Sequence, residues 1–215
     1  MRTLGLIGLL AITPIYVTGC ATAAYSIQEK FGIEKRDILV DRVEDVSKSQ
    51  NDAKEEFEDA LEAFRAVVAI DGGELEQTYD RLKDAYERAD SQAGDVRGRV
   101  ASVKRVSRDL FKEWEAELGD YSDAGLRRAS EQQLRDTRQR YDGLVDKMDA
   151  ATAAMDPVLT VFNDRVLFLK HNLNARSIAS LDGETAILQR DVDRLIAEME
   201  QSIAAADDFI AAMRT

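Results

Sequence analysis

The chain contains little that could support covalent or metal chemistry. Among its 215 residues there are one cysteine, one histidine, one tryptophan and two prolines. A single cysteine excludes an internal disulfide and a thiolate metal cluster, and a single histidine excludes a histidine pair at a metal. No stretch resembles a nucleophile elbow, a phosphate-binding loop or a zinc motif. The sequence therefore predicts a protein that is not an enzyme and that holds no cofactor and no metal.

Positive charge is also scarce. The 29 lysines and arginines are outnumbered by 41 acidic residues, which gives a formal net charge of -12. Basic clusters are missing: Lys35-Arg36 and Arg127-Arg128, for example, are isolated pairs. Nucleic-acid binding depends on basic side chains that neutralise phosphates, so we expect no nucleic-acid partner. The acidic run at residues 55–59 is typical of the solvated face of a helix rather than of a metal site.

The N-terminus has the features of an export signal. A short positive start, Met1-Arg2, precedes the nine-residue apolar run at 4–12. This run is too short to cross a bilayer, which needs about 20 apolar residues, but it fits a signal peptide. Val17-Thr18-Gly19-Cys20 resembles the bacterial lipobox, in which the cysteine accepts the lipid. We therefore predict a lipoprotein signal peptide at 1–19 and lipidation of Cys20; an ordinary signal peptide or N-terminal anchor with an incidental cysteine is the alternative.

The residues after Cys20 bear on the location of the protein. One acyl chain holds a protein only marginally, whereas two or three anchor it stably. Ala21 follows the cysteine, where lipoproteins retained at the inner membrane of Gram-negative bacteria commonly have aspartate. By this resemblance we predict a periplasmic protein anchored to the inner leaflet of the outer membrane. Residues 20–33 form a short membrane tether, whose apolar side chains either rest on lipid headgroups or pack on the end of the folded domain.

The remaining residues, 34–215, predict a domain of long helices. Apolar residues recur with the 3–4 spacing of a heptad seam over about 37–70, 74–118, 124 onward and 183–213, and no strand pattern occurs. Gly72-Gly73 and residues 119–123 predict turns. The fold class is therefore all-α, an elongated antiparallel helical bundle or coiled coil of about four long helices. Trp114 continues a seam, so we expect it in the core.

The segment 157–173 departs from the simple seam. Pro157 predicts either a kink or a new helix start with Asp156 as N-cap, so the continuity of a helix over 126–180 is open. Apolar residues face more than one side of the segment, which favours central burial, with Phe162 and Leu169 in the core. The alternative is an exposed patch for a partner or a lipid. The candidate patch residues are Phe162, Phe168, Lys170, His171, Asn172 and Asn174.

Three stretches of the chain resemble an uncharacterised family of bacterial lipoproteins, domain of unknown function 2959. They are FGIEKRDILVDRV at 31–43, FKEWE at 111–115 and VLFLKHNLNA at 166–175. The resemblance covers nearly all of the chain after Cys20. It implies a lipoprotein with coiled helices, and it carries over neither an activity nor functional residues.

These observations lead to a hypothesis about function. We expect a membrane-anchored periplasmic lipoprotein that acts as a non-catalytic structural or protein-interaction module of the cell envelope. Its partners are the membrane, through the lipid on Cys20, and an unknown envelope protein; a homo-oligomer is left open. The alternative is a carrier or sensor of an apolar ligand or lipid that uses the helix at 157–173. An enzyme that relies on carboxylates alone would need a pair with a raised pKa in a cleft.

Overall fold

The computed structural model describes residues 35–70 and 74–214. The chain divides into two units, Met1–Lys35 and Arg36–Thr215. The predicted signal peptide, Cys20 and the predicted tether at 20–33 lie outside the described residues.

Four long helices make up most of the described part. They are α2 (Lys35–Val68), α3 (Leu75–Glu117), α4 (Ala124–His171) and α6 (Thr185–Arg214). The short helix α5 (Ala175–Ala179) and the 3-10 turn η1 (Asp182–Glu184) connect α4 to α6. The predicted helices at 37–70, 74–118 and 183–213 begin and end within two residues of the observed ones. The described residues contain no strand, which confirms the all-α prediction.

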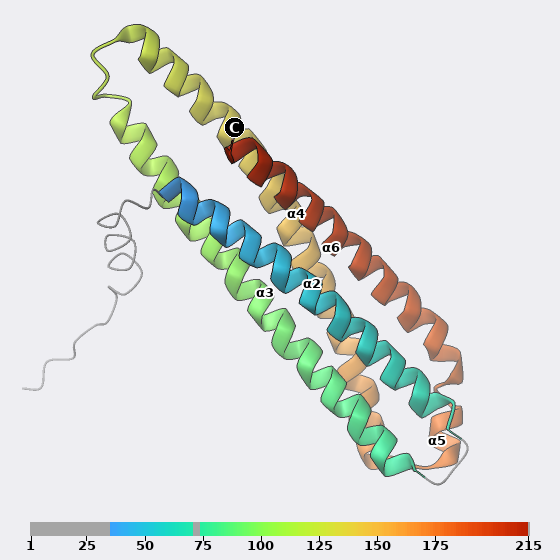
Figure 1. Cartoon of the computed structure of the whole chain (residues 1–215). Helices are drawn as coiled ribbons and strands as arrows, with labels where there is room; N and C mark the ends of the chain where they lie inside the picture. The colour runs from blue at the N-terminus through green and yellow to red at the C-terminus, as the bar shows by residue number, and fades with distance from the viewer. Residues whose placement is uncertain (1–34, 71–73, 215) are drawn as a thin grey trace, which may run out of the picture. The chain divides into compact units, whose positions relative to one another are not determined.

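The four helices run antiparallel to their neighbours and form one bundle (Figure 1). Side-chain contacts link neighbouring helices around the bundle: Arg88–Glu56 for α3 and α2, Lys104–Asp149 for α3 and α4, Lys147–Gln201 for α4 and α6, and Lys54–Glu200 for α2 and α6. Each helix therefore has two neighbours and turns one side to solvent. None of the helices in the described ranges carries an apolar stretch able to cross a membrane.

The heptad seams form the core. The predicted seam of α2 is wholly buried, with Val43, Phe57 and Phe64 fully covered. On α4 the seam residues Met148, Met155, Phe162 and Leu169 have no exposed surface, which confirms the core placement of Phe162 and Leu169. Gln50 fills the seam position between Val46 and Ala53 and is also fully buried. Its amide atoms have no hydrogen-bond partner within the described ranges.

Two tyrosines of α3 with the 3–4 spacing of the seam, Tyr79 and Tyr86, lie at its edge. Tyr79 and Tyr86 are only partly buried, whereas their smaller neighbours Thr78 and Ala85 are almost completely covered. A tyrosine at the edge of a seam keeps its polar hydroxyl in water, which avoids a desolvation cost, while its ring still covers apolar surface.

Helix α4 passes through Pro157 without a break. Pro157 lies on the exposed side, and the helix continues to His171 before it ends at Asn172. Of the two alternatives left open at Pro157, a new helix start with Asp156 as N-cap does not occur, and the Asp156 carboxylate pairs with Arg97 on α3. A proline on the solvent side removes one hydrogen bond but leaves the core seam intact on both sides. The region up to residue 180 is not one helix, because α5 follows as a separate turn.

The pair α3 and α4 extends beyond the start of α2 and the end of α6 (Figure 1). We call residues 112–133 the α3–α4 projection. Trp114 lies in it and is only partly buried, which corrects the prediction of a core position. Two of the four helices that would bury it are missing at this level, and its indole N–H instead donates to Ser130 Oγ at 2.8 Å.

An aromatic cluster closes the core at the base of the projection. The rings of Phe111 and Tyr141 meet edge to face at 5.3 Å, and Tyr141 lies 6.5 Å from Phe209 of α6. The guanidinium of Arg138 covers Phe111 at 5.1 Å from the ring centroid. These contacts seal the apolar interior where α6 ends.

Candidate functional site

The six predicted patch residues lie at the carboxyl end of α4 and just beyond it. Phe162 is fully buried in the core and does not belong to a surface patch. Phe168 is 38% exposed, and Lys170 and His171 are exposed beside it. Asn172 and Asn174 follow in the connection to α5. The structure thus groups five of the six residues and separates Phe162 from them.

The two asparagines serve the ends of helices. Asn172 is the C-cap of α4, where its backbone N–H donates to the Leu169 carbonyl and its Nδ2 donates to the Phe168 carbonyl at 2.9 Å. The side-chain oxygen of Asn174 accepts hydrogen bonds from the backbone N–H and the hydroxyl of Ser177. Both side chains satisfy backbone groups that a helix end leaves unpaired. Their polar atoms are therefore engaged in shaping the turn between α4 and α5.

Sequence reasoning missed two exposed apolar side chains in this region. Leu167 is 52% exposed, more than Phe168, and Ile187 at the start of α6 is 47% exposed. The prediction of central burial for the segment 157–173 is therefore wrong in part: its inward stripe is buried, but Leu167 and Phe168 face solvent. The signal was present in the spacing, because both lie off the stripe formed by Phe162, Val166 and Leu169.

A buried polar group lies where α4 meets α6. Arg165 of α4 pairs with Glu184 of η1. The Nε of Arg165, the hydroxyl of Thr185 and the amide oxygen of Gln189 are buried and have no hydrogen-bond partner within the described residues. These atoms belong to α4 and to the first turns of α6. Hydrogen bonds from a bound group or from solvent would suit them.

The grooves of the bundle run between neighbouring helices and are open to solvent. One of about 520 Å³ lies between α2 and α6 and is lined by Ser47, Asn51, Ile203 and Ile210 among others. The groove between α4 and α6 is lined by Arg140, Gly143 and Leu144 rather than by residues 157–173. A carrier of an apolar ligand would need a cavity beside 157–173. The inward side chains of that segment, Phe162 and Leu169, instead pack without exposed surface.

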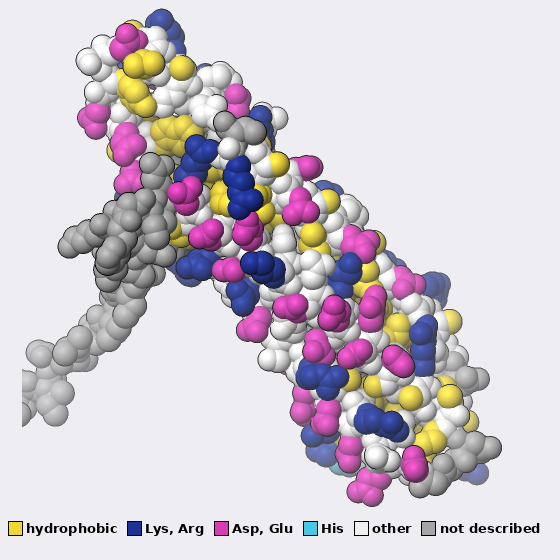
Figure 2. Space-filling model, in the orientation of Figure 1, with side chains coloured by type: hydrophobic (Ala, Val, Ile, Leu, Met, Phe, Trp, Pro, Cys, Tyr) yellow, Lys and Arg dark blue, Asp and Glu magenta, His cyan; other side chains and the backbone are white. Residues whose placement is uncertain are grey.

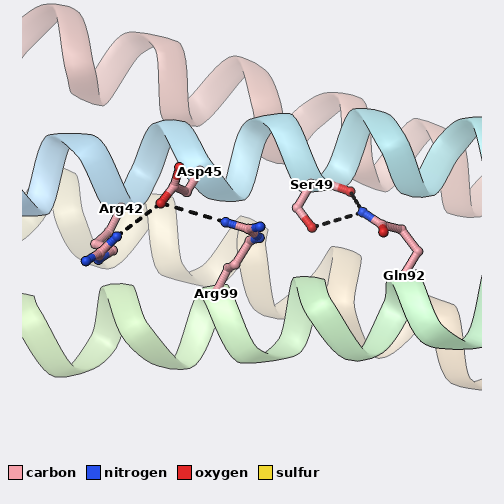
Figure 3. Close-up of polar contacts among 5 residues, drawn as sticks. All are labelled: Arg42, Asp45, Ser49, Gln92 and Arg99. Carbon is pink, nitrogen blue, oxygen red and sulfur yellow. Dashed lines mark hydrogen bonds and ion pairs between the residues drawn. The ribbon is translucent and has the colours of Figure 1, made fainter. Parts of the chain in front are cut away.

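Polar side chains bridge α2 and α3 at the outer edge of their interface (Figure 3). Asp45 of α2 accepts a hydrogen bond from Arg42 at 3.2 Å and pairs with Arg99 of α3 at 3.7 Å. One turn further on, the amide of Gln92 donates to the carbonyl and the hydroxyl of Ser49. All five groups have partners, so this cluster joins the two helices and fixes their register.

Several ionisable side chains among the described residues have pKa values shifted by their surroundings. A hydrogen bond from Arg138 lowers the pKa of Glu115, an exposed carboxyl on α3. Burial raises the pKa of Tyr141 in the aromatic cluster, and burial also raises that of Tyr86. A hydrogen bond to Glu87 raises the pKa of Lys83. Each shift has a structural cause, and the described ranges hold no group of three or more side chains placed to bind a metal.

Comparison with known proteins places the chain in a family without assigning it an activity. The model of the family described as "Protein of unknown function (DUF2959)" matches residues 24–213. No curated protein and no solved structure matches the chain. Because the match covers nearly the whole chain, the protein belongs to the DUF2959 family of proteins of unknown function.

Proposed function

We propose that the protein is a lipid-anchored periplasmic module that binds another protein of the cell envelope through the carboxyl end of α4. The observation that carries the proposal is the contrast between the two sides of this helix. Phe162 and Leu169 are fully buried, whereas Leu167 and Phe168, which lie among them in sequence, remain on the solvent side. Exposed large apolar side chains in neighbouring positions are typical of an interaction surface.

The surroundings of Leu167 and Phe168 favour a protein partner. Lys170 and His171 lie next to them on the surface and can donate hydrogen bonds at the rim of an apolar contact. The capped turn formed by Asn172 and Asn174 holds this end of α4 in one conformation. A preformed surface loses little conformational entropy on binding.

The lipid anchor is supported by the lipobox-like residues Val17-Thr18-Gly19-Cys20 and by the uniqueness of the cysteine. Metabolic labelling with a palmitate analogue tests it. We expect label on the wild-type chain and none on Cys20→Ser. Equal labelling of the two chains would contradict the anchor.

Site-specific crosslinking in intact cells tests the partner surface. A photoreactive amino acid replaces Leu167 or Phe168, and the control replaces Asn163, an exposed polar residue of the same helix. We expect positions 167 and 168 to capture one defined envelope protein and position 163 to capture none. Capture that is absent, or equal at all three positions, would refute the proposal.

A further inference from the structure

In the part of the chain that the structure describes, two of the four long helices, α2 and α6, end before the α3–α4 projection. Arg42 of α2 and Ser102 of α3 line the same groove. Because the helices are antiparallel and α2 begins seven residues before Arg42, its first residue lies level with about residue 109 of α3. At the other side, Ala212, close to the end of α6, lines a groove with Arg140. Among residues 35–70 and 74–214, only α3 and α4 surround the seam residues that lie beyond the ends of α2 and α6.

Apolar side chains are exposed at the end of the projection. Leu126 is 61% exposed and Tyr121 is 42% exposed, while Trp114 and Leu118 are partly buried. Leu126 lies one position before the seam of α4, which continues back from Leu134 and Thr137 to Arg127 and Ser130, so its side chain faces solvent. Figure 2 shows hydrophobic side chains gathered on this end of the bundle. Aromatic and aliphatic side chains in this arrangement suit the boundary between water and lipid.

Two arginines beside these side chains can bind the phosphate of a phospholipid headgroup. Arg127 and Arg128 follow Leu126 directly, and Arg128 has no ion-pair partner in the described structure. The carboxylate of Asp123 accepts hydrogen bonds from the N–H groups of Gly125 and Leu126, so it is engaged as the N-cap of α4. Over residues 112–133 six acidic side chains outnumber three basic ones, so this end is not a basic patch. The guanidinium of Arg128 can still bind a lipid phosphate directly.

A second copy of the chain fits this surface less well. A second copy can fill the space beyond the ends of α2 and α6 only if the two bundles meet end to end, with the two projections side by side. Two-fold symmetry then places α3 beside the α3 of the other copy. Residues 112–118 carry three glutamates and one lysine, so like charges would face each other.

The attachment point of the N-terminal segment lies at the same end. Cys20 precedes Lys35, the first residue of α2, by fifteen positions. A chain of this length reaches at most about 50 Å at ~3.5 Å per residue. The projection extends only about 15 Å past the start of α2, at ~1.5 Å per residue over residues 109–118. A membrane that holds Cys20 is therefore within reach of the projection.

We infer that the end of the α3–α4 projection, with Tyr121 and Leu126, touches the phospholipid surface that holds Cys20. This inference rests on the lipid anchor of the proposed function. The contact gives the bundle a second attachment point, so that it stands on the membrane with the carboxyl end of α4 directed away from it.

Fluorescence of the lipidated full chain in phosphatidylcholine vesicles, with and without phosphatidylglycerol, tests the inference. Leu126→Cys introduces the one thiol available for an environment-sensitive label, because lipid occupies the sulfur of Cys20. Ile187→Cys is the matched control, since Ile187 is 47% exposed at the start of α6, at the opposite end of the bundle. We expect brominated phospholipids to quench the label at 126 and shift its emission to the blue, and to leave the label at 187 unchanged.

The outcomes separate the two proposals. A chain that does not float with the vesicles refutes the anchor and the inference together. A chain that floats but shows equal emission at 126 and 187 overturns the inference and leaves the anchor standing. A shift at 126 that appears only as the protein-to-lipid ratio rises indicates a second copy and also overturns it. The sole tryptophan, Trp114, provides a check without substitution, because brominated phospholipids should quench it in the wild-type chain.

Discussion

Phe162→Ala and Phe168→Ala change the same type of residue six positions apart on one helix, but on opposite sides. Phe162 has no exposed surface, whereas Phe168 is 38% exposed. Truncation of a buried phenylalanine costs about 3–5 kcal/mol, because transfer energy is lost and a cavity remains. A domain is usually stable by only ~5–15 kcal/mol, so Phe162→Ala should remove a large fraction of the free energy of unfolding.

Phe168→Ala should cost less than about half as much, because solvent already reaches the ring and no closed cavity forms. Leu169→Ala and Leu167→Ala form a second matched pair, with Leu169 fully buried and Leu167 52% exposed. The assay is urea unfolding, followed by circular dichroism, of a chain that starts after the predicted signal peptide and carries Cys20→Ser. A mutation that alters packing alone shifts the midpoint and leaves the slope unchanged.

The result that would refute this reasoning is equal destabilisation within each pair. It would mean that Leu167 and Phe168 are covered as completely as Phe162 and Leu169. The interaction surface proposed at the carboxyl end of α4 would then be part of the core.

Three further predictions concern other parts of the bundle. Gly94→Ala and Gly98→Ala should each raise the stability by about 0.5–1 kcal/mol, because a Cβ at either position meets nothing within 4 Å; an unchanged or lower melting temperature would contradict this. Pro157→Ala restores a hydrogen bond in mid-helix and should also raise the melting temperature, unless α4 is broken at this point in solution. Burial raises the pKa of Tyr141, so the folded state should resist its ionisation. The resulting stability is fully present below the tyrosine pKa of the unfolded chain and is lost as pH rises through the pKa of Tyr141 in the folded chain. Alkaline unfolding of the wild type and of Tyr141→Phe measures this loss. An identical dependence of stability on pH in the two chains would contradict the prediction.

The sequence determined the helices because their signals are local and repeated. The 3–4 spacing of α2 from Val43 to Val67 defines one face, and that face is buried throughout. Glycines and short polar turns mark the ends of the helices, so the predicted bounds of α2, α3 and α6 agree closely with the observed ones. Phe162 and Leu169 could be placed in the core for the same reason: a seam position is buried wherever its neighbours continue along it.

Tertiary structure alone decided how many helices surround each part of a seam. Trp114 has seam spacing, yet α2 and α6 end before reaching it, and the helix lengths that cause this become apparent only when the helices are set side by side. The continuity of α4 through Pro157 was undecided for a related reason. A proline costs one hydrogen bond locally, and packing of Met155, Val158 and Phe162 on both sides of it keeps the helix in one piece. Leu167 and Phe168 face solvent because α4 occupies a corner of a four-helix bundle, and periodicity cannot distinguish a corner helix from a central one.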